Sequence, residues 1–234
     1  MKASIILGGV VIGVVAAFFA LKQLPSGTQA GPKPPPKPPV DVAAVRAKAE
    51  AGDAAAQAQL GRLYTKGEGV TNSYKEAVAW FRRSADQGND EGQFGLAEMY
   101  DAGQAVKQDF GEAVKFYRLS AEQGNVGAQY ALGFLYESGR GVPQNQVEAT
   151  KWYKLAAEQG DALAQYDIGQ RYEIGVGTAI DLPEALKWLL LAAAQGQADS
   201  VTRADRIKSK MSREQIEEAK RRQAAFSPRP GIKP

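Results

Sequence analysis

The sequence predicts an all-α protein, an α/α solenoid of four 36-residue helix-turn-helix repeats with helical caps, preceded by one transmembrane helix. Periodic glycines are the first observation behind this prediction, because self-similarity at a fixed interval marks repeat architectures. Within each interval, capping residues and apolar stripes of helical period mark two helices. An unbroken apolar run near the amino terminus is the third observation. Five glycines set the interval, without insertion or deletion between them: Gly52, Gly88, Gly124, Gly160 and Gly196.

The amino-terminal segment predicts a membrane anchor. Seventeen consecutive apolar residues, 5–21, lie between Lys2 and Lys22, after a short tail at residues 1–4. At about 1.5 Å per residue, a helix of this length just crosses the roughly 30 Å hydrocarbon core of a bilayer. A cleaved signal peptide is the alternative, because a basic start followed by an apolar stretch fits both. We expect a retained signal anchor, whereas cleavage would release a secreted soluble protein.

Two glycines within this segment and the prolines after it bear on helix association and on the distance of the repeats from the membrane. Gly9 and Gly13 form a GxxxG pair, which predicts at most weak self-association of two such helices. Seven of the twelve prolines precede residue 40, most of them in the run from Pro32 to Pro39. Such a run favours polyproline II and spans about 25 Å at roughly 3.1 Å per residue. Residues 22–40 are therefore predicted to be a stiff spacer between the membrane and the repeats.

Each repeat opens with a helix that begins after a capping side chain. In the first repeat, positions 56, 57, 60 and 64 share one face at 100° per residue, as a buried helix side requires. The segment Tyr-x-x-Gly then ends the helix, because glycine enters the left-handed region without steric cost. The four capping residues are Asp53, Asn89, Asn125 and Asp161.

The second helix of each repeat begins at another capping residue, with glutamate three positions later. This spacing predicts a capping box in every copy. The small residues Ser84 and Ala85, repeated as a small pair in each copy, would let the next helix pack close. The capping residue and glutamate pairs are Ser73 and Glu76, Asp109 and Glu112, Asn145 and Glu148, and Asp181 and Glu184.

The ends of the array depart from the repeat. Leu190 stands where the other repeats have Arg82, Arg118 and Lys154, so an outward face has become apolar and is expected to be covered by C-terminal helices. Gln104-Ala105 replaces the second loop glycine, which predicts a less tight loop in repeat two. The predicted segments are an N-terminal cap at 41–52, repeats at 53–88, 89–124, 125–160 and 161–196, C-terminal capping helices at 197–226, and a disordered tail at 227–234.

Over residues 49–196, the repeats resemble the Sel1-like repeat, a relative of the tetratricopeptide repeat, in its bacterial envelope type. The pattern that carries the resemblance is Ala-x-x-Gly-Asp-x-x-Ala-Gln-x-x-Leu-Gly-x-x-Tyr-x-x-Gly-x-Gly-Val, followed by Ala-x-x-Trp-Tyr-x-x-Ala-Ala. The resemblance implies right-handed superhelical stacking, with the first helices on a concave face. It also implies a scaffold or adaptor role in protein complexes, often at the bacterial envelope.

Function is expected on the concave face, opposite the shared core positions of the first helices. Aromatic side chains there would suit an extended partner peptide, because large rigid rings contribute contact area at low entropy cost. Burial of the aromatics between repeats is the alternative, and Phe134 occupies the more variable position. The candidate partner-binding residues are Arg62, Phe94, Glu98, Tyr130, Phe134, Tyr166 and Gln170.

Composition argues against catalysis. The chain has no histidine and no cysteine, which removes imidazole bases, Ser-His and Cys-His nucleophile pairs, and Cys- or His-ligated zinc. We therefore expect no enzyme, no catalytic residue, no metal and no cofactor, and a ligand-binding or hydrolase-like module is a distant alternative. The net charge of +3 hides a central segment, 41–196, that is acidic at −6, so nucleic acid is not expected as a partner.

The predicted location is the bacterial inner membrane, crossed once, with the repeat domain in the periplasm. A short basic tail before a long polar domain is the usual arrangement of an exported domain. A secreted or periplasmic soluble protein is the alternative. The predicted function is accordingly a membrane-anchored scaffold or adaptor that binds a partner protein or peptide.

Overall fold

The computed structural model describes residues 40–234. The predicted tail at 1–4, the anchor at 5–21 and all but the last residue of the spacer at 22–40 lie outside the described residues. Within the described part, no helix has the length and apolar character needed to cross a membrane. The helices found there are α2 (Val42–Glu50), α3 (Ala54–Lys66), α4 (Tyr74–Asp86), α5 (Asp90–Ala102), α6 (Phe110–Glu122), α7 (Val126–Ser138), α8 (Gln146–Glu158), α9 (Ala162–Ile174), α10 (Leu182–Ala194), α11 (Ala198–Lys208) and α12 (Arg213–Ala224).

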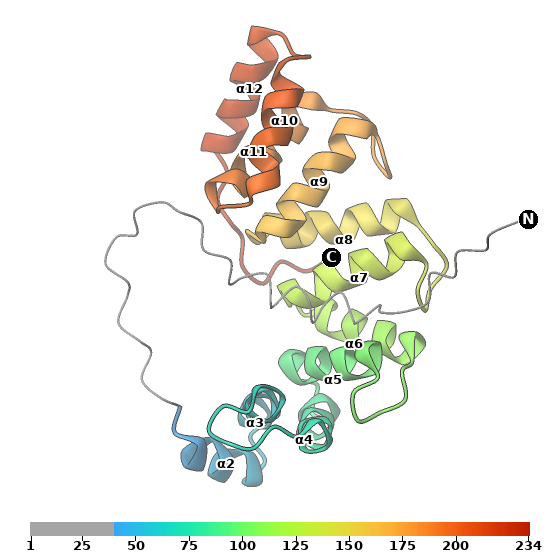
Figure 1. The fold of residues 1–234 in the computed structure, drawn as a ribbon, viewed down its shortest axis with the longest axis vertical. Helices are drawn as coiled ribbons and strands as arrows, with labels where there is room; N and C mark the ends of the chain where they lie inside the picture. The colour runs from blue at the N-terminus through green and yellow to red at the C-terminus, as the bar shows by residue number, and fades with distance from the viewer. Residues whose placement is uncertain (1–39) are drawn as a thin grey trace, which may run out of the picture.

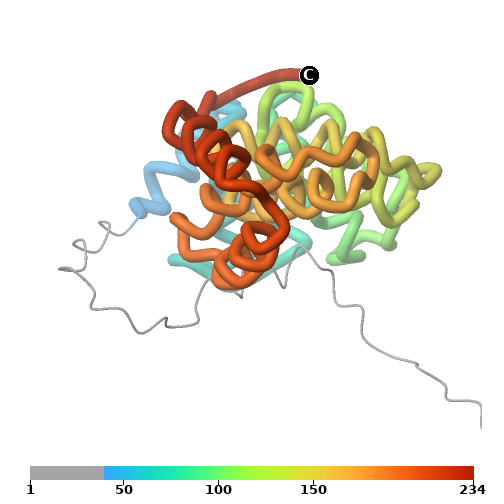
Figure 2. The backbone as a smooth tube through the Cα atoms, turned by 90° about the horizontal axis from the view of Figure 1, so that it is seen from above, coloured from blue at the N-terminus to red at the C-terminus, as the bar shows by residue number. Residues whose placement is uncertain are grey.

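The helices form a stack of four pairs, α3 with α4, α5 with α6, α7 with α8 and α9 with α10 (Figure 1). Helix α2 covers one end of the stack, and α11 and α12 pack on α10 at the other end. Figure 2 shows the stack from above, with the C-terminal helices at the near end and the tail running along one edge of the array. The predicted all-α solenoid of four repeats with capping helices is confirmed.

The first helix of each repeat begins and ends as its sequence dictates. Asp53 accepts a hydrogen bond from the backbone N–H of Ala56, and the corresponding side chains of the other three repeats do the same. Each helix ends at a glycine in the left-handed region, with φ between 66° and 75°, where a Cβ would be strained. These glycines are Gly67, Gly103, Gly139 and Gly175.

The capping boxes predicted for the second helices are only half formed. Ser73 accepts from the N–H of Glu76, which is half of a capping box. The N–H of Ser73, which the box would leave to the glutamate side chain, instead donates to the carbonyl of Tyr64 at 3.0 Å. This bond closes the loop between the two helices and leaves the box half formed. The same bond recurs from Asp109 to Tyr100, from Asn145 to Tyr136 and from Asp181 to Tyr172.

The loop of repeat two is as tight as the others, contrary to the prediction. Ala105 adopts φ 57°, close to the φ values of 71°, 70° and 66° at Gly69, Gly141 and Gly177. The hydrogen bond from Asp109 to Tyr100 closes this loop as it does in the other repeats. The loop geometry is therefore imposed by its closure, and the alanine takes up a strained conformation.

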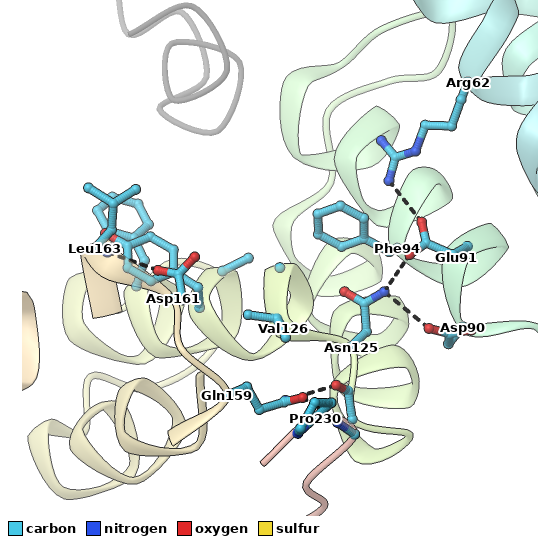
Figure 3. Close-up of a pocket in the computed structure, with 16 residues that line it drawn as sticks. Arg62, Asp90, Glu91, Phe94, Asn125, Val126, Gln159, Asp161, Leu163 and Pro230 are labelled. Atoms are coloured by element: carbon cyan, nitrogen blue, oxygen red, sulfur yellow. Dashed lines mark hydrogen bonds and ion pairs between the residues drawn. The ribbon is translucent and has the colours of Figure 1, made fainter. Parts of the chain in front are cut away.

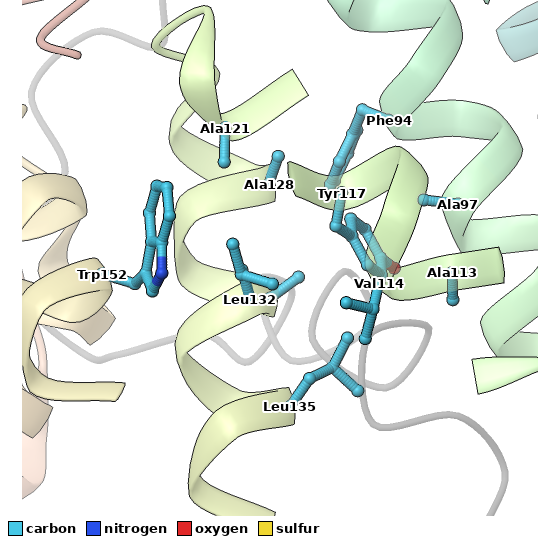
Figure 4. Close-up of a cluster of buried hydrophobic side chains, with 11 residues drawn as sticks. Phe94, Ala97, Ala113, Val114, Tyr117, Ala121, Ala128, Leu132, Leu135 and Trp152 are labelled. Atoms are coloured by element: carbon cyan, nitrogen blue, oxygen red, sulfur yellow. The ribbon is translucent and has the colours of Figure 1, made fainter. Parts of the chain in front are cut away.

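The core lies between the two helix layers and continues from repeat to repeat. Figure 4 shows Tyr117 of α6 and Leu132 of α7 packed between Phe94 of α5 and Trp152 of α8, so this cluster joins two adjacent helix pairs. Glycine permits the closest approaches, because a Cβ at Gly133 would lie 2.8 Å from the ring of Tyr153. Because each helix pair buries its face on its neighbours, the stack and its concave side form together.

A glutamine pair joins the first helix of each repeat to the end of its second helix. In every copy, the Nε2 of one glutamine donates to the Oε1 of a glutamine 30 residues earlier, at 2.7 to 2.9 Å. The earlier member is buried, with at most 5% of its surface exposed. The pairs are Gln87 with Gln57, Gln123 with Gln93, Gln159 with Gln129, and Gln195 with Gln165.

Both ends of the array are covered. In α2, Val45 and Ala49 are buried against α3 and Trp80, as their register predicts. At the other end, Leu190 packs against a cluster that includes Ala204 and Ala219 of the two C-terminal helices. The predicted cover over this apolar position is confirmed. Helix α12 also begins with the predicted capping box, formed by Ser212 and Gln215.

Candidate partner-binding groove

A groove of about 650 Å³ lies along the concave side of the array (Figure 3). Its walls come from α3, α5 and α7, from the start of α9 and from the C-terminal tail. The first helices of consecutive repeats thus supply the walls, as the predicted concave face requires. The lining residues are Arg62, Asp90, Glu91, Phe94, Gly124, Asn125, Val126, Gly127, Tyr130, Ala131, Phe134, Gln159, Asp161, Leu163, Pro230 and Gly231.

Phe94 lines the groove but belongs mostly to the core. Its side chain is 6% exposed, and its ring lies 5.7 Å from that of Tyr117. A Cβ at Gly127 of the next repeat would lie 2.8 Å from the Phe94 ring, so this glycine makes room for the contact. For Phe94, burial between repeats is therefore what the structure shows.

Tyr130 and Phe134 are half-buried and lie one turn apart on α7. The hydroxyl of Tyr130 donates to Asp167 Oδ2 at 2.9 Å, and its ring packs 5.2 Å from that of Tyr153. The guanidinium of Arg140 lies 5.5 Å from the centre of the Phe134 ring. Both aromatic side chains face the groove, and Tyr130 is the more firmly held of the two.

Three of the predicted residues lie outside the groove lining. Tyr166 packs against the cluster between α10 and the C-terminal helices. Glu98 accepts a hydrogen bond from Arg62 behind the lining, and Gln170 is half-buried on α9. The structure thus brings four of the seven predicted residues together, namely Arg62, Phe94, Tyr130 and Phe134.

The charges of the groove are mostly negative. Asp90, Glu91 and Asp161 line it, whereas Arg62 is the one cation among the lining residues described. The charge of Arg62 is offset, because it pairs with Glu98 and lies 3.5 Å from Glu91. A groove with this balance attracts cationic ligands.

Burial perturbs two carboxylates that lie behind the lining. It raises the pKa of Glu98 above its ordinary value, although the nearby Arg62 opposes the shift. It also raises the pKa of Asp167 to about 6, while the hydrogen bond from Tyr130 opposes the shift. The negative charge of this wall therefore decreases as the pH falls toward 6.

The C-terminal tail lies in the groove and was missed by the sequence prediction, which expects disorder at 227–234. The Arg229 N–H donates to the Glu158 carbonyl at 2.9 Å, and its guanidinium pairs with the Glu158 carboxylate. Farther along the tail, Gly231 and Ile232 bind Gln159 and Gln129. These contacts order a segment of polar and proline-rich composition, which by itself cannot bury enough apolar surface to fold. The one sequence signal for these tail contacts was the glutamine that precedes the last glycine of every repeat, such as Gln159 before Gly160.

The carboxylates near the groove do not form a metal-binding group in the described part of the chain. Among residues 40–234, no group of three or more histidine, cysteine, aspartate or glutamate side chains could hold a metal ion. The carboxylates of the lining are tied to structural partners, as Asp90 and Glu91 are to the side-chain amide of Asn125, at 3.1 and 3.2 Å (Figure 3).

Comparisons with known proteins agree with this architecture. A family model described as the Sel1 repeat matches four consecutive segments, residues 54–89, 90–125, 126–161 and 162–197. No curated protein matches the chain significantly.

Solved structures of several bacterial proteins are similar to this chain. A Sel1 repeat protein from Oxalobacter formigenes is 31% identical, with a TM-score of 0.66 over 71% of this chain and 48% of that one. The protein c5321, a protective antigen present in uropathogenic Escherichia coli strains and displaying an SLR fold, is 25% identical, with a TM-score of 0.53 over 79% and 48% of the two chains. The immunity protein PA5088 from Pseudomonas aeruginosa shares the fold at 23% identity, with a TM-score of 0.52 over 86% and 79%. The chain spans about half the length of the first two proteins.

Proposed function

The chain belongs to the Sel1 repeat family, and on this premise we propose that it is a scaffold that holds a segment of a partner protein in its concave groove. The observation that carries the proposal is the groove itself, whose walls come from consecutive repeats. Solenoids use such extended concave surfaces for binding. The absence of histidine and cysteine from the sequence favours binding over the hydrolase-like alternative.

Phe134 is the side chain on which we expect partner binding to depend most. It is half-buried on the groove wall, so part of its ring remains available for contact. Large aromatic side chains near the centre of an interface commonly contribute about 2 kcal/mol or more to binding. A loss of that size reduces the affinity more than tenfold.

The test is crosslinking in cells followed by mass spectrometry of the proteins recovered with the full chain. Phe134→Ala is expected to reduce partner recovery more than tenfold, with unchanged helix content. Tyr74→Ala is the matched control, because Tyr74 is also aromatic, is 37% exposed and lies on α4 outside the groove. Equal recovery with the wild type and with Phe134→Ala would contradict the proposed site.

We further propose that the scaffold is anchored in the bacterial inner membrane through residues 5–21, with its repeats in the periplasm. The apolar run between Lys2 and Lys22 and the proline-rich spacer support this placement. Fractionation should recover the full chain with membranes, and detergent but not high salt should release it. Protease added to spheroplasts should digest the repeats. Recovery of a shortened chain in the soluble periplasmic fraction would favour signal-peptide cleavage and a secreted or periplasmic protein.

A further inference from the structure

The tail is held by a repeated element of the array. The N–H of Gly231 donates to Oε1 of Gln159, and the carbonyl of Ile232 accepts from Nε2 of Gln129 at 2.8 Å. The two glutamines form one of the four glutamine pairs, with their own bond at 2.8 Å. Two joined side-chain amides thus offer one acceptor and one donor to a passing main chain, much as the edge of a β-sheet does.

The tail matches this pair through its backbone conformation. Gly231 has φ 71°, and it follows Pro230 in a turn. Proline followed by glycine suits a type II turn, because the second central residue has positive φ. Neither bond to the glutamine pair uses a tail side chain. This contact recognises backbone geometry rather than side-chain identity.

Charge supplies the second part of the recognition. Arg229 of the tail pairs with Glu158, whose carboxylate is mostly shielded at 16% exposure. Beyond the tail, the groove presents Asp90, Glu91 and Asp161. An extended segment that carries positive charge at one or more positions complements these walls.

The features that hold the tail continue where the tail does not reach. The next glutamine pair along the array, Gln123 with Gln93, is joined by the same kind of hydrogen bond, at 2.7 Å. It has no hydrogen bond with the tail among those described, and it lies in the repeat that contributes Phe94 to the groove. A ligand longer than the tail could therefore contact both repeats.

We propose, resting on the proposed function, that the partner segment is an extended, cationic peptide with a proline-glycine turn, and that residues 227–234 occupy its site as a built-in competitor. The tail has the sequence Ser-Pro-Arg-Pro-Gly-Ile-Lys-Pro, and only Ala225 and Phe226 separate it from α12. A ligand tethered this closely has an effective concentration on the order of millimolar. It therefore weakens the binding of a free peptide with a Kd of about 100 μM by roughly tenfold.

The experiment measures binding of a labelled peptide to the full chain in detergent by fluorescence anisotropy. The probe is fluorescein attached to Ser-Pro-Arg-Pro-Gly-Ile-Lys-Pro, and the protein is either wild type or the tail double variant Arg229→Glu and Gly231→Val. A Cβ at position 231 meets no atom within 4 Å, so Gly231→Val acts through backbone conformation and not through a clash. The variant changes no residue of the array that faces the tail.

The tail variant is expected to bind the probe about tenfold more tightly than the wild type, and binding should weaken with salt. A probe that carries the same two substitutions is the matched control and should bind neither protein measurably. Binding of both probes with equal affinity would overturn the backbone and charge recognition.

Two further outcomes would overturn the proposal. A lower melting temperature of the variant without probe binding would show that the tail is a structural strap only. A concentration-dependent dimer that forms with the wild type and not with the variant would assign the groove to the tail of a second copy. Neither outcome affects the Phe134→Ala recovery experiment, so the proposed function is tested separately.

Discussion

Gln159 donates a hydrogen bond to the buried side chain of Gln129 across 30 residues of sequence, and both amides also bind the C-terminal tail. The other three repeats contain the same glutamine pair. Among the hydrogen bonds described, none joins these three pairs to the tail. A contact that stabilises the stack everywhere thus serves recognition at one place.

The glutamine pairs predict unequal effects for their two members. Gln165 is fully buried and also donates to the Ala157 carbonyl at 3.2 Å, whereas its partner Gln195 is exposed. Gln165→Leu should lower the free energy of unfolding by about 1–3 kcal/mol, because it leaves polar groups unpaired. Gln195→Ala should cost less than about 1 kcal/mol, because water reaches the vacated position. Urea unfolding followed by circular dichroism measures both, and equal losses would contradict the argument.

Ala105→Gly should stabilise the protein. Alanine at φ 57° is strained by about 1–2 kcal/mol, and glycine relieves this at a smaller entropic cost in the unfolded chain. The expected net gain in unfolding free energy is about 0.5–1 kcal/mol. The control is Ala79→Gly, an exposed site inside α4, where the same change should cost about 1 kcal/mol. A lower free energy of unfolding for both variants would show that Ala105 does not keep this strained conformation in solution.

Asp167 predicts a pH dependence of stability. Its pKa is about 6 in the folded protein, above about 3.9 for an unfolded aspartate. Its protonated form is therefore favoured by folding, so this contribution is complete below pH 4 and is lost as the pH rises to 6. Because Asp167 is half-buried, we expect this contribution to the free energy of unfolding to be roughly 1–2 kcal/mol.

Asp167→Asn tests this, because the asparagine oxygen can still accept from Tyr130 and does not titrate. The stability difference between wild type and variant should change between pH 4 and 6 and be constant above pH 7. A constant difference across the whole range would exclude the raised pKa. The neighbouring charges of Glu137, Asp161 and Arg171 are the same in both proteins and cancel in this comparison.

Glu173 predicts a difference between two arginines of the C-terminal cap. Its carboxylate is 5% exposed and binds Arg203 at 2.6 Å and Arg206 at 3.1 Å. Arg203 is 17% exposed and Arg206 is 56% exposed. Arg203→Ala should lower the free energy of unfolding by about 1–3 kcal/mol, whereas Arg206→Ala should lower it by less than about 1 kcal/mol. Thermal unfolding in low salt compares them, and a larger loss for Arg206→Ala would reverse the assignment.

Periodicity explains why the fold was predictable. Each repeat carries the same caps and apolar stripes, so four copies support one assignment, and the apolar Leu190 indicated the cover at the end. What periodicity could not show is how loops close. The bond from Ser73 N–H to the Tyr64 carbonyl depends on the path of the loop backbone, which the sequence pattern does not encode.

The groove was predictable only in part, for two physical reasons. A helical wheel places Phe94 opposite the core of its own helix, but stacking of the next repeat covers it, because Gly127 allows close approach. The tail depends on contacts between residues far apart in sequence, such as Gln129 with Ile232. Its own composition predicts disorder, so only the assembled groove reveals its place.

The cover over Leu190 also closes the end of the repeat array. A solenoid that left its last apolar face open could accept the first repeat of another copy, and such a head-to-tail contact continues without closing into a ring. Helices α11 and α12 cover this face, and α2 covers the opposite end, so the apolar surfaces at which such growth would start are buried. The end helices thus remove the apolar end faces that would favour head-to-tail association of two copies.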